Sequence, residues 1–336
     1  MHTRYLAPLN YDRFFKKVFS DLNIAQRFLE DFLNVKIDSI ELMGLSYKIT
    51  DDAVAVEFDY RCQIDGQYVV IDMQQWYKTD IVKRFYVYFA LNSVLQLENI
   101  PTKSLDLGEE RKHETKNYDT LAPAITLIWI VDETLKFKED FIAYTVLPEQ
   151  SADFIRNEDI WVRTNWRALK KEHQRVLKIL NNDAKNLDFL SKNRLIYAFQ
   201  KNIVKNSKYS KYLKWFEFAE KTRDPNNKKE DFVKYEKDEI FMAVINRIRT
   251  DNLKSEEFQY IDDYEEFRRQ VKIHEDVLRK EFFSEGFKEA MSKKDYSVVK
   301  NLLINSDFSD DKIALIVGVK VDFVKKLRKK FASKPD

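Results

Sequence analysis

The chain has 336 residues, a length that suggests roughly two domains and a core that needs no disulfide or structural metal. It carries 58 Lys and Arg against 56 Asp and Glu, a formal net charge of +2, so overall charge does not indicate a nucleic-acid binder, although a local basic face stays open. The single cysteine, Cys62, excludes a disulfide framework and a cysteine-rich zinc site. The five glycines lack the spacing of a P-loop or a dinucleotide fingerprint, which excludes P-loop NTPases and Rossmann enzymes.

Composition also predicts the compartment. No run of about 18 apolar residues occurs, and Met1–Leu9 has no signal-peptide core, so we expect neither a membrane span nor export. A lone cysteine is typical of a reducing cytoplasm. The 4 histidines are isolated in sequence, so zinc is not expected, and no motif indicates a small organic cofactor. The sequence therefore predicts a cytoplasmic protein without a membrane partner.

The first part of the chain changes from a helical to a strand period. Apolar spacing predicts two helices over Asp12–Leu33, with a break near Asp21–Asn23. A period of two then predicts strands at Ile37–Ile49, Val54–Ile64 and Tyr68–Trp76.

The following segment predicts one more helix and two strands. Thr79–Leu97 returns to helical spacing, and the polar stretch Thr102–Thr120 is expected to be a loop. The apolar run Ala124–Val131 is typical of a buried strand, with Phe141–Leu147 as its expected neighbour.

Beyond Pro148 the pattern is mostly helical. Lys221–Lys229 is charged and rich in turn residues, so it is the expected linker. Two short helices, Asp310–Val317 and Val321–Phe331, have the size and spacing of a helix-turn-helix.

The most informative segment is the predicted β-hairpin. Val54–Ile64 alternates between apolar and polar residues, so Glu57 and Asp59 share its polar face. The dipeptide Asp65-Gly66 then predicts a two-residue type I′ turn, because both positions of this turn need positive φ. Such a turn fixes the register of the two arms.

In that register Asp59 lies opposite Asp72, and Glu57 lies opposite Gln74, with Cβ atoms about 4.5–5.5 Å apart. Opposed carboxylates repel each other, and a hard divalent cation with oxygen ligands would relieve the repulsion. Asp72 also interrupts a hydrophobic run, where an acid is either paired or functional. The alternative is a surface hairpin in which Arg61 pairs with one of these carboxylates.

Several short motifs occur in a definite order between about Leu9 and Leu147. In chain order they are the helix start Asp12, Phe15 and Lys16, the pair Phe58-Asp59, the triplet Asp72-Met73-Gln74, Arg84 with Tyr88, and Tyr118 leading into the strand Pro123–Val131. This ordered set resembles the Rpn-type recombination-promoting nucleases and transposase-associated nucleases of the PD-(D/E)XK superfamily. The helical remainder is similar to that family as well.

The resemblance implies a mixed α/β fold with an αβββαβ nuclease core over residues 1–150. It further implies a helical accessory region over 151–290 and a small helix-turn-helix-like unit over 291–336. The implied activity is metal-dependent hydrolysis of DNA phosphodiesters by an endonuclease, linked to recombination, mobile elements or defence. DNA is the implied partner, and a homodimer stays open.

The resemblance also assigns residues. Asp59 would be the first acid, Asp72 the second, and Gln74 would occupy the place of the superfamily lysine. Mg²⁺ or Mn²⁺ would be held by these two acids and the carbonyl of Met73, polarising the phosphate and activating water. Glu57 would be an auxiliary ligand or a water-orienting base.

Two departures from the family are visible. The family usually has Glu where this chain has Asp72, and Gln74 cannot carry the charge of lysine. These departures favour the alternative function, which is a non-catalytic nucleic-acid-binding or regulatory protein that keeps the nuclease scaffold. Asp12 could join the metal site or simply cap its helix.

Candidate DNA contacts lie on helices. Lys16 could contact phosphate or lie on a solvated face, and Arg84 with Tyr88, at i and i+4, could clamp a strand or pack on the sheet. The dense basic run near the end of the chain could contact phosphates or could complement the helix dipole. Its predicted DNA contacts are Lys325, Lys326, Arg328 and Lys329.

Overall fold

The structure is a computed structural model with two compact units, Met1–Leu253 and Lys254–Asp336. It describes residues 4–47, 55–75, 80–106, 112–162, 166–181, 187–271, 273, 299–300, 302–303, 309–317 and 319–332.

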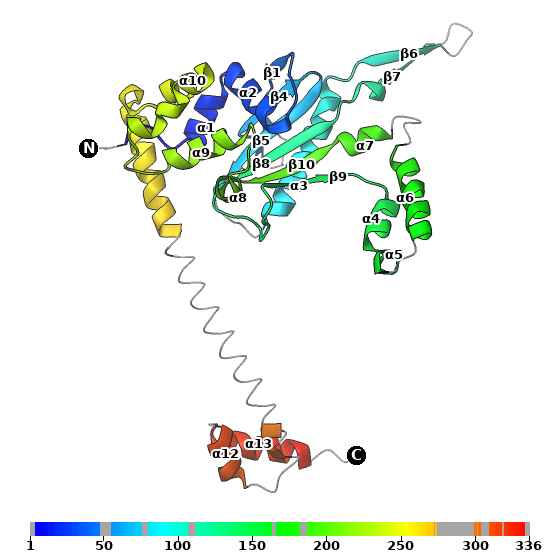
Figure 1. Cartoon of the computed structure of the whole chain (residues 1–336), viewed down its shortest axis with the longest axis vertical. Helices are drawn as coiled ribbons and strands as arrows, with labels where there is room; N and C mark the ends of the chain where they lie inside the picture. Colours follow the sequence, from blue (N-terminus) through cyan, green and yellow to red (C-terminus); the bar gives the residue numbers. More distant parts are fainter. Residues whose placement is uncertain are drawn as a thin grey trace. The chain divides into compact units, whose positions relative to one another are not determined.

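A six-stranded mixed sheet with the order β1-β4-β5-β8-β10-β9 forms the centre of the first unit (Figure 1). β1, β4 and β5 are antiparallel, β8 is parallel to both β5 and β10, and β9 is antiparallel to β10. The fold is therefore mixed α/β, as expected. The strands are β1 (Ile40–Leu42), β4 (Tyr60–Ile64), β5 (Gln67–Gln74), β8 (Ala124–Ile130), β9 (Phe141–Thr145) and β10 (Arg194–Phe199).

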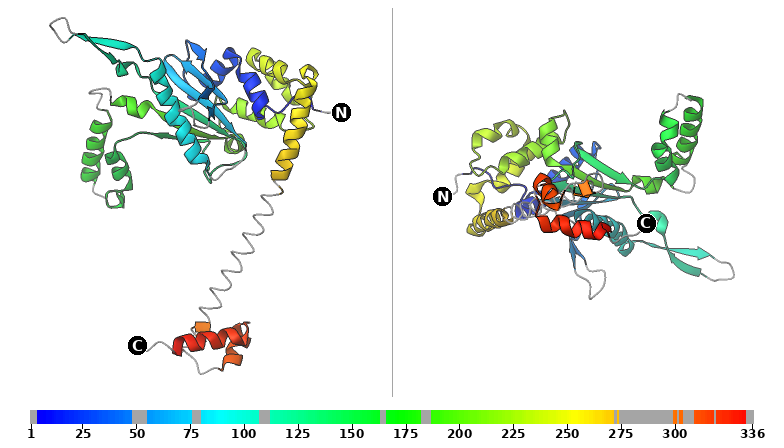
Figure 2. Two further views of the ribbon diagram at one scale, coloured as in Figure 1. Left: turned by 180° about the vertical axis from the view of Figure 1, so that it is seen from behind. Right: turned by 90° about the horizontal axis from the view of Figure 1, so that it is seen from below.

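Helices cover both faces of this sheet. On one face Trp129 of β8 stacks on Phe28 of α2 (Leu22–Leu33), with ring centroids 5.5 Å apart. On the other face Ile128 and its neighbours form a core with Phe85 of α3 (Ile81–Val94). This helix lies in front of the sheet in the left view of Figure 2. Every residue of β8 is buried for this reason.

The two N-terminal helices form as predicted. α1 (Asp12–Phe19) buries Phe14, Phe15, Val18 and Phe19 on one stripe. The Asp21 carboxylate accepts hydrogen bonds from the backbone N–H groups of Asn23 and Ile24 and thereby caps α2. This cap is the physical cause of the predicted break.

The predicted hairpin and its register are confirmed. Asp65 and Gly66 have φ of 43° and 82°, as the two-residue turn requires. The ladder runs from the pair Ile64 and Gln67 to the pair Tyr60 and Ile71.

The first arm is nevertheless shorter than predicted. β4 begins at Tyr60, and the preceding β3 (Val56–Glu57) pairs with β2 (Ser46–Tyr47) in a separate two-stranded sheet. The expectation that Glu57 lies opposite Gln74 is therefore wrong, since the chain leaves the ladder at Phe58 and Asp59.

Two other expectations about strands are wrong. Thr102–Thr120 contains a hairpin of β6 (Thr102–Asp106) and β7 (Lys112–Lys116), a two-stranded ribbon whose described side chains are exposed or half-buried. β10 lies between β8 and β9, so Phe141–Leu147 is not the neighbour of Ala124–Val131. The position of β9 in the sheet depends on which strands pair in the tertiary structure, and the local periodicity of a segment does not encode that pairing.

The units divide at Leu253, not near residues 150 or 290, because β10 completes the sheet of the first unit. The helices between β9 and β10 are α4 (Glu149–Arg156), α5 (Glu158–Val162), α6 (Trp166–Leu180) and α7 (Asp188–Lys192). After β10 the first unit continues with α8 (Gln200–Asn206), α9 (Leu213–Thr222), the 3-10 helix η4 (Lys229–Tyr235) and α10 (Glu239–Ile248).

Lys221–Lys229 is not a linker. Its Asn227 side chain is buried, accepts from the Leu6 N–H at 2.8 Å and donates to the Leu6 carbonyl at 3.0 Å. These bonds tie the stretch to the N-terminal segment of the same unit.

The second unit contains the two predicted short helices, α12 (Asp310–Val317) and α13 (Val321–Ala332). They share a small core with Val299, formed by Ile313, Ala314, Val324 and Leu327. Residues 255–271 are helical. Within the described part of the chain, no helix is long and apolar enough to cross a membrane.

Arg61 is buried under α3 and does not pair with the hairpin acids. Its Nε donates to Asn92 Oδ1 at 3.2 Å, and its Nη1 donates to Tyr47 Oη at 2.6 Å. The guanidinium carbon also lies 5.1 Å from the ring centroid of Tyr47. The alternative in which Arg61 neutralises a hairpin carboxylate is therefore wrong.

We expect Asn92→Leu to destabilise the first unit by about 3 kcal/mol, because a buried Arg61 would lose its acceptor. The Asn92 amide also donates to the carbonyls of Tyr68 and Ile125. Urea unfolding measures the effect, and Ser93→Ala, which removes only a bond to the preceding helical turn, should cost less than about 0.5 kcal/mol. Equal losses would contradict the structural role of Asn92.

Candidate functional site

Asp59 and Asp72 lie together where the hairpin ladder ends. Asp59 Oδ2 accepts the Met73 N–H at 2.8 Å, and the backbone N–H of Asp59 lies close enough to the Asp72 carboxylate to oppose the rise in its pKa. The bond from Met73 takes the place of the next rung of the ladder. The sequence-based placement of both acids in one cluster is supported by this geometry.

Both carboxyl groups lie in a low-dielectric environment. The side chain of Asp59 is 16% exposed and residue Asp72 is 5% exposed. Burial raises the pKa of Asp59 to about 8, with further contributions from the Asp72 charge and a hydrogen bond with Asp12, against the opposing Met73 N–H. Burial likewise raises the pKa of Asp72 to about 7, although the Arg84 charge opposes the increase. The site therefore favours a bound cation or protons over two bare negative charges.

Lys16 of α1 joins the acids on one side. Its Nζ lies 3.1 Å from Asp12 Oδ1, 3.1 Å from Glu57 Oε1 and 3.6 Å from Asp59 Oδ1. Burial lowers the pKa of Lys16, but these carboxylates outweigh it and leave the pKa raised. Asp12 and Glu57 thus belong to the cluster. Glu57 is connected to it by its ion pair with Lys16, and not by the predicted strand register.

Arg84 of α3 lies on the other side. Its Nη2 donates to Gln74 Oε1, and its guanidinium carbon lies 4.4 Å from the ring centroid of Phe85 and 5.7 Å from that of Tyr88. Burial, and then the Asp72 charge, raise the pKa of Tyr88. The structure therefore brings Gln74, Arg84 and Tyr88 to the site, and the sequence had not indicated the bond from Gln74 to Arg84.

The two carboxylates suit a hard cation whose remaining ligands are waters and substrate oxygens. Among the described residues no group of three or more His, Cys, Asp or Glu side chains is placed to hold a metal ion. Mg²⁺, however, is usually held by one or two carboxylates together with waters and substrate phosphates. Asp59 and Asp72 fit that requirement, and the Met73 carbonyl as a third ligand stays a prediction.

The basic residues of the second unit have different roles. Lys325, Lys326 and Lys329 are exposed on α13. Arg328 Nε instead donates to Asp310 Oδ1 at 2.7 Å and connects α13 to α12. The predicted phosphate contacts of the three lysines remain compatible with their exposure, whereas Arg328 has a structural partner.

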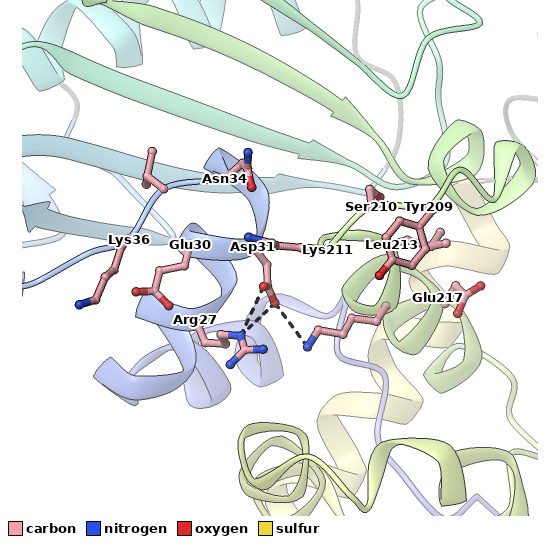
Figure 3. Close-up of a pocket in the computed structure, with 12 residues that line it drawn as sticks. Arg27, Glu30, Asp31, Asn34, Lys36, Tyr209, Ser210, Lys211, Leu213 and Glu217 are labelled. Atoms are coloured by element: carbon pink, nitrogen blue, oxygen red, sulfur yellow. Dashed lines mark hydrogen bonds and ion pairs between the residues drawn. The ribbon is translucent and has the colours of Figure 1, made fainter.

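A cavity of about 670 Å³ between α2 and α9 lies apart from the acid pair (Figure 3). Its buried acid, Asp31, accepts the Trp215 Nε1–H at 2.9 Å and forms ion pairs with Arg27 and Lys214 at 3.3 and 3.5 Å. These partners neutralise Asp31, so this carboxylate has a structural role.

No protein-family model, curated protein or solved structure matched the chain when it was compared with each of these.

The raised pKa values predict how stability varies with pH. A carboxyl that is protonated more readily in the folded state stabilises the fold at low pH, and this contribution is lost as pH rises through its folded pKa. Without metal, we expect the free energy of unfolding to fall between about pH 5 and 8, by up to about 1.4 kcal/mol per pH unit for each carboxyl.

Asp72→Asn should make the metal-free protein no less stable at pH 8 and should reduce that slope, because it removes one of the two repelling charges. Thermal melts in EDTA across this range measure both quantities, with the exposed Asp38→Asn as the control. A strongly destabilised Asp72→Asn protein at pH 8 would rule out repulsion between the two acids.

Proposed function

We propose that the protein is a divalent-metal-dependent DNA endonuclease that hydrolyses phosphodiester bonds. The observation that carries the proposal is the buried acid pair, Asp59 and Asp72, which lies between two cations from opposite helices, Lys16 and Arg84. A phosphodiester needs positive charge on its oxygens as it is attacked, and a metal on the acid pair with flanking cations can provide it.

The order of elements supports the same proposal. α1 precedes the antiparallel strands β1, β4 and β5, and α3 then leads to β8, which is parallel to β5. This is the αβββαβ order implied by the resemblance to PD-(D/E)XK nucleases, so we propose such a core for the first unit. A link to recombination, mobile elements or defence belongs to this proposal.

In the proposed reaction Asp59 and Asp72 would hold Mg²⁺ or Mn²⁺, with the Met73 carbonyl as a further ligand. The bound ion would polarise a phosphoryl oxygen as a Lewis acid and would lower the pKa of water. Glu57, whose side chain is 67% exposed, would accept a proton from an attacking water.

Arg84 supplies the positive charge that Gln74 lacks. Gln74 Oε1 accepts from its guanidinium, so Gln74 acts as a positioning residue, and a planar guanidinium is well suited to phosphate oxygens. Tyr88 packs against the same group. The replacement of lysine by Gln74 is thus compatible with catalysis.

We expect the purified protein to nick supercoiled plasmid in Mg²⁺ or Mn²⁺ and to be inactive in EDTA. Asp59→Ala and Asp72→Ala should each reduce the rate at least about 100-fold, because each removes a metal ligand. Agarose-gel assays measure nicking, and circular dichroism verifies the fold. Asp38→Asn, an exposed acid distant in sequence from the pair, is the matched control, and nicking that survives in both alanine variants would disprove the proposal.

A second candidate is DNA binding without cleavage through the C-terminal unit. It is favoured by α13, which packs on its own small core and exposes Lys325, Lys326 and Lys329. If the plasmid assay shows no activity, this function would account for the basic helix.

Substitution of these three lysines by alanine should weaken DNA binding and reduce the slope of log K against log salt by up to about 2.7, at about 0.9 for each phosphate that the variant no longer neutralises. The variant spares Val324 and Leu327, so the core of the unit is kept. Fluorescence anisotropy at several salt concentrations gives the slope. An unchanged slope would mean that α13 does not contact phosphates.

A further inference from the structure

Lys16 connects the acids of the site through one ammonium group. Its Nζ contacts Asp12, Glu57 and Asp59, and the contact with Asp59 is the longest of the three, at 3.6 Å against 3.1 Å for each of the others. The backbone of Lys16 is held in place because its neighbour Phe15 is fully buried. Its flexible stem of four carbons lets the ammonium move while the helix stays fixed.

The three carboxylates differ in what else holds them. Asp59 is already bound at Oδ2 by the Met73 N–H, so Oδ1 is the oxygen that faces Lys16. The side chains of Asp12 and Glu57 are 49% and 67% exposed. They can therefore keep the ammonium near the mouth of the site after it has left Asp59.

Arg84 does not have this freedom. Its guanidinium donates to Gln74 and packs over the rings of Phe85 and Tyr88. Of the two flanking cations, Arg84 is the fixed one and Lys16 is the one that can be displaced.

We propose that Lys16 is the internal counterion of the metal-free acid pair, and that a divalent cation on Asp59 and Asp72 displaces its ammonium toward a phosphate oxygen of the substrate. This inference rests on the proposed function, since it needs the metal site. The physical reason is that two positive ions at one carboxylate repel each other strongly in a partly buried site. A nucleic-acid phosphate supplies the negative charge that receives the displaced ammonium.

The test is calorimetric titration of Mn²⁺ into the full-length protein without DNA. Lys16→Met should bind Mn²⁺ roughly tenfold more tightly than the wild type, because the competing charge is gone. Lys16→Arg keeps the charge and should bind within about threefold of the wild type. The matched control is Lys83→Met, an exposed lysine of α3, whose effect should stay below about twofold because solvent and salt screen it.

A second measurement separates competition from a merely structural ion pair. In EDTA Lys16→Met should melt at a lower temperature than the wild type at pH 8, since the acids lose their counterion, and Mn²⁺ should remove that difference. A Lys16→Met protein that folds only with Mn²⁺ would support the same conclusion, whereas a deficit that persists in saturating Mn²⁺ would overturn it.

The outcomes distinguish the two proposals. If the wild type binds Mn²⁺ and Lys16→Met binds it equally or more weakly, the counterion role of Lys16 is overturned while the metal site stands. If neither the wild type nor Lys16→Met binds Mn²⁺, the metal site itself is overturned, and the inference about Lys16 with it.

Discussion

The first unit depends on two carboxylates that lie side by side in a low-dielectric environment. Asp59 and Asp72 repel each other, and burial disfavours both charges. The fold compensates with backbone N–H groups from the opposite arm of the hairpin and with cations from two helices. Because an isolated buried charge is so costly, the positions of α1 and α3 relative to the sheet are tied to the acids as well as to the hydrophobic core.

The interruption of the first hairpin arm creates this arrangement. A continuous strand would have paired the N–H of Met73 with the backbone of the first arm, whereas here that N–H donates to Asp59 Oδ2 at 2.8 Å. Phe58 is fully buried beside the break and contacts the ring of Tyr88 from α3, with centroids 5.4 Å apart. The apolar packing of Phe58 thus holds the chain where it leaves the ladder, and the two acids lie at the end of the hairpin ladder.

The three cations near the hairpin, Arg61, Arg84 and Lys16, have different partners. Arg61 lies beneath α3 with an amide, a hydroxyl and aromatic rings as neighbours. Arg84 and Lys16 face the acids instead. Arg61 and Asp59 share one face of the predicted strand, yet they have separate partners because the strand ends between Phe58 and Tyr60. Strand alternation alone could not distinguish a structural arginine from a cation of the site.

Features that depend on adjacent residues could be read from the sequence. The α1–α2 break followed from the Asp21 cap, and the hairpin register followed from Asp65-Gly66, so the local sequence was enough to place Asp59 and Asp72 together. Three features became visible only in the folded chain: β10 lies between β8 and β9, Glu57 contacts Lys16, and Gln74 accepts a hydrogen bond from Arg84. The physical reason is that turn geometry and caps are set by a few adjacent residues. Strand order and ion pairs, in contrast, depend on which distant segments pack together, and the local period of a segment does not carry that information.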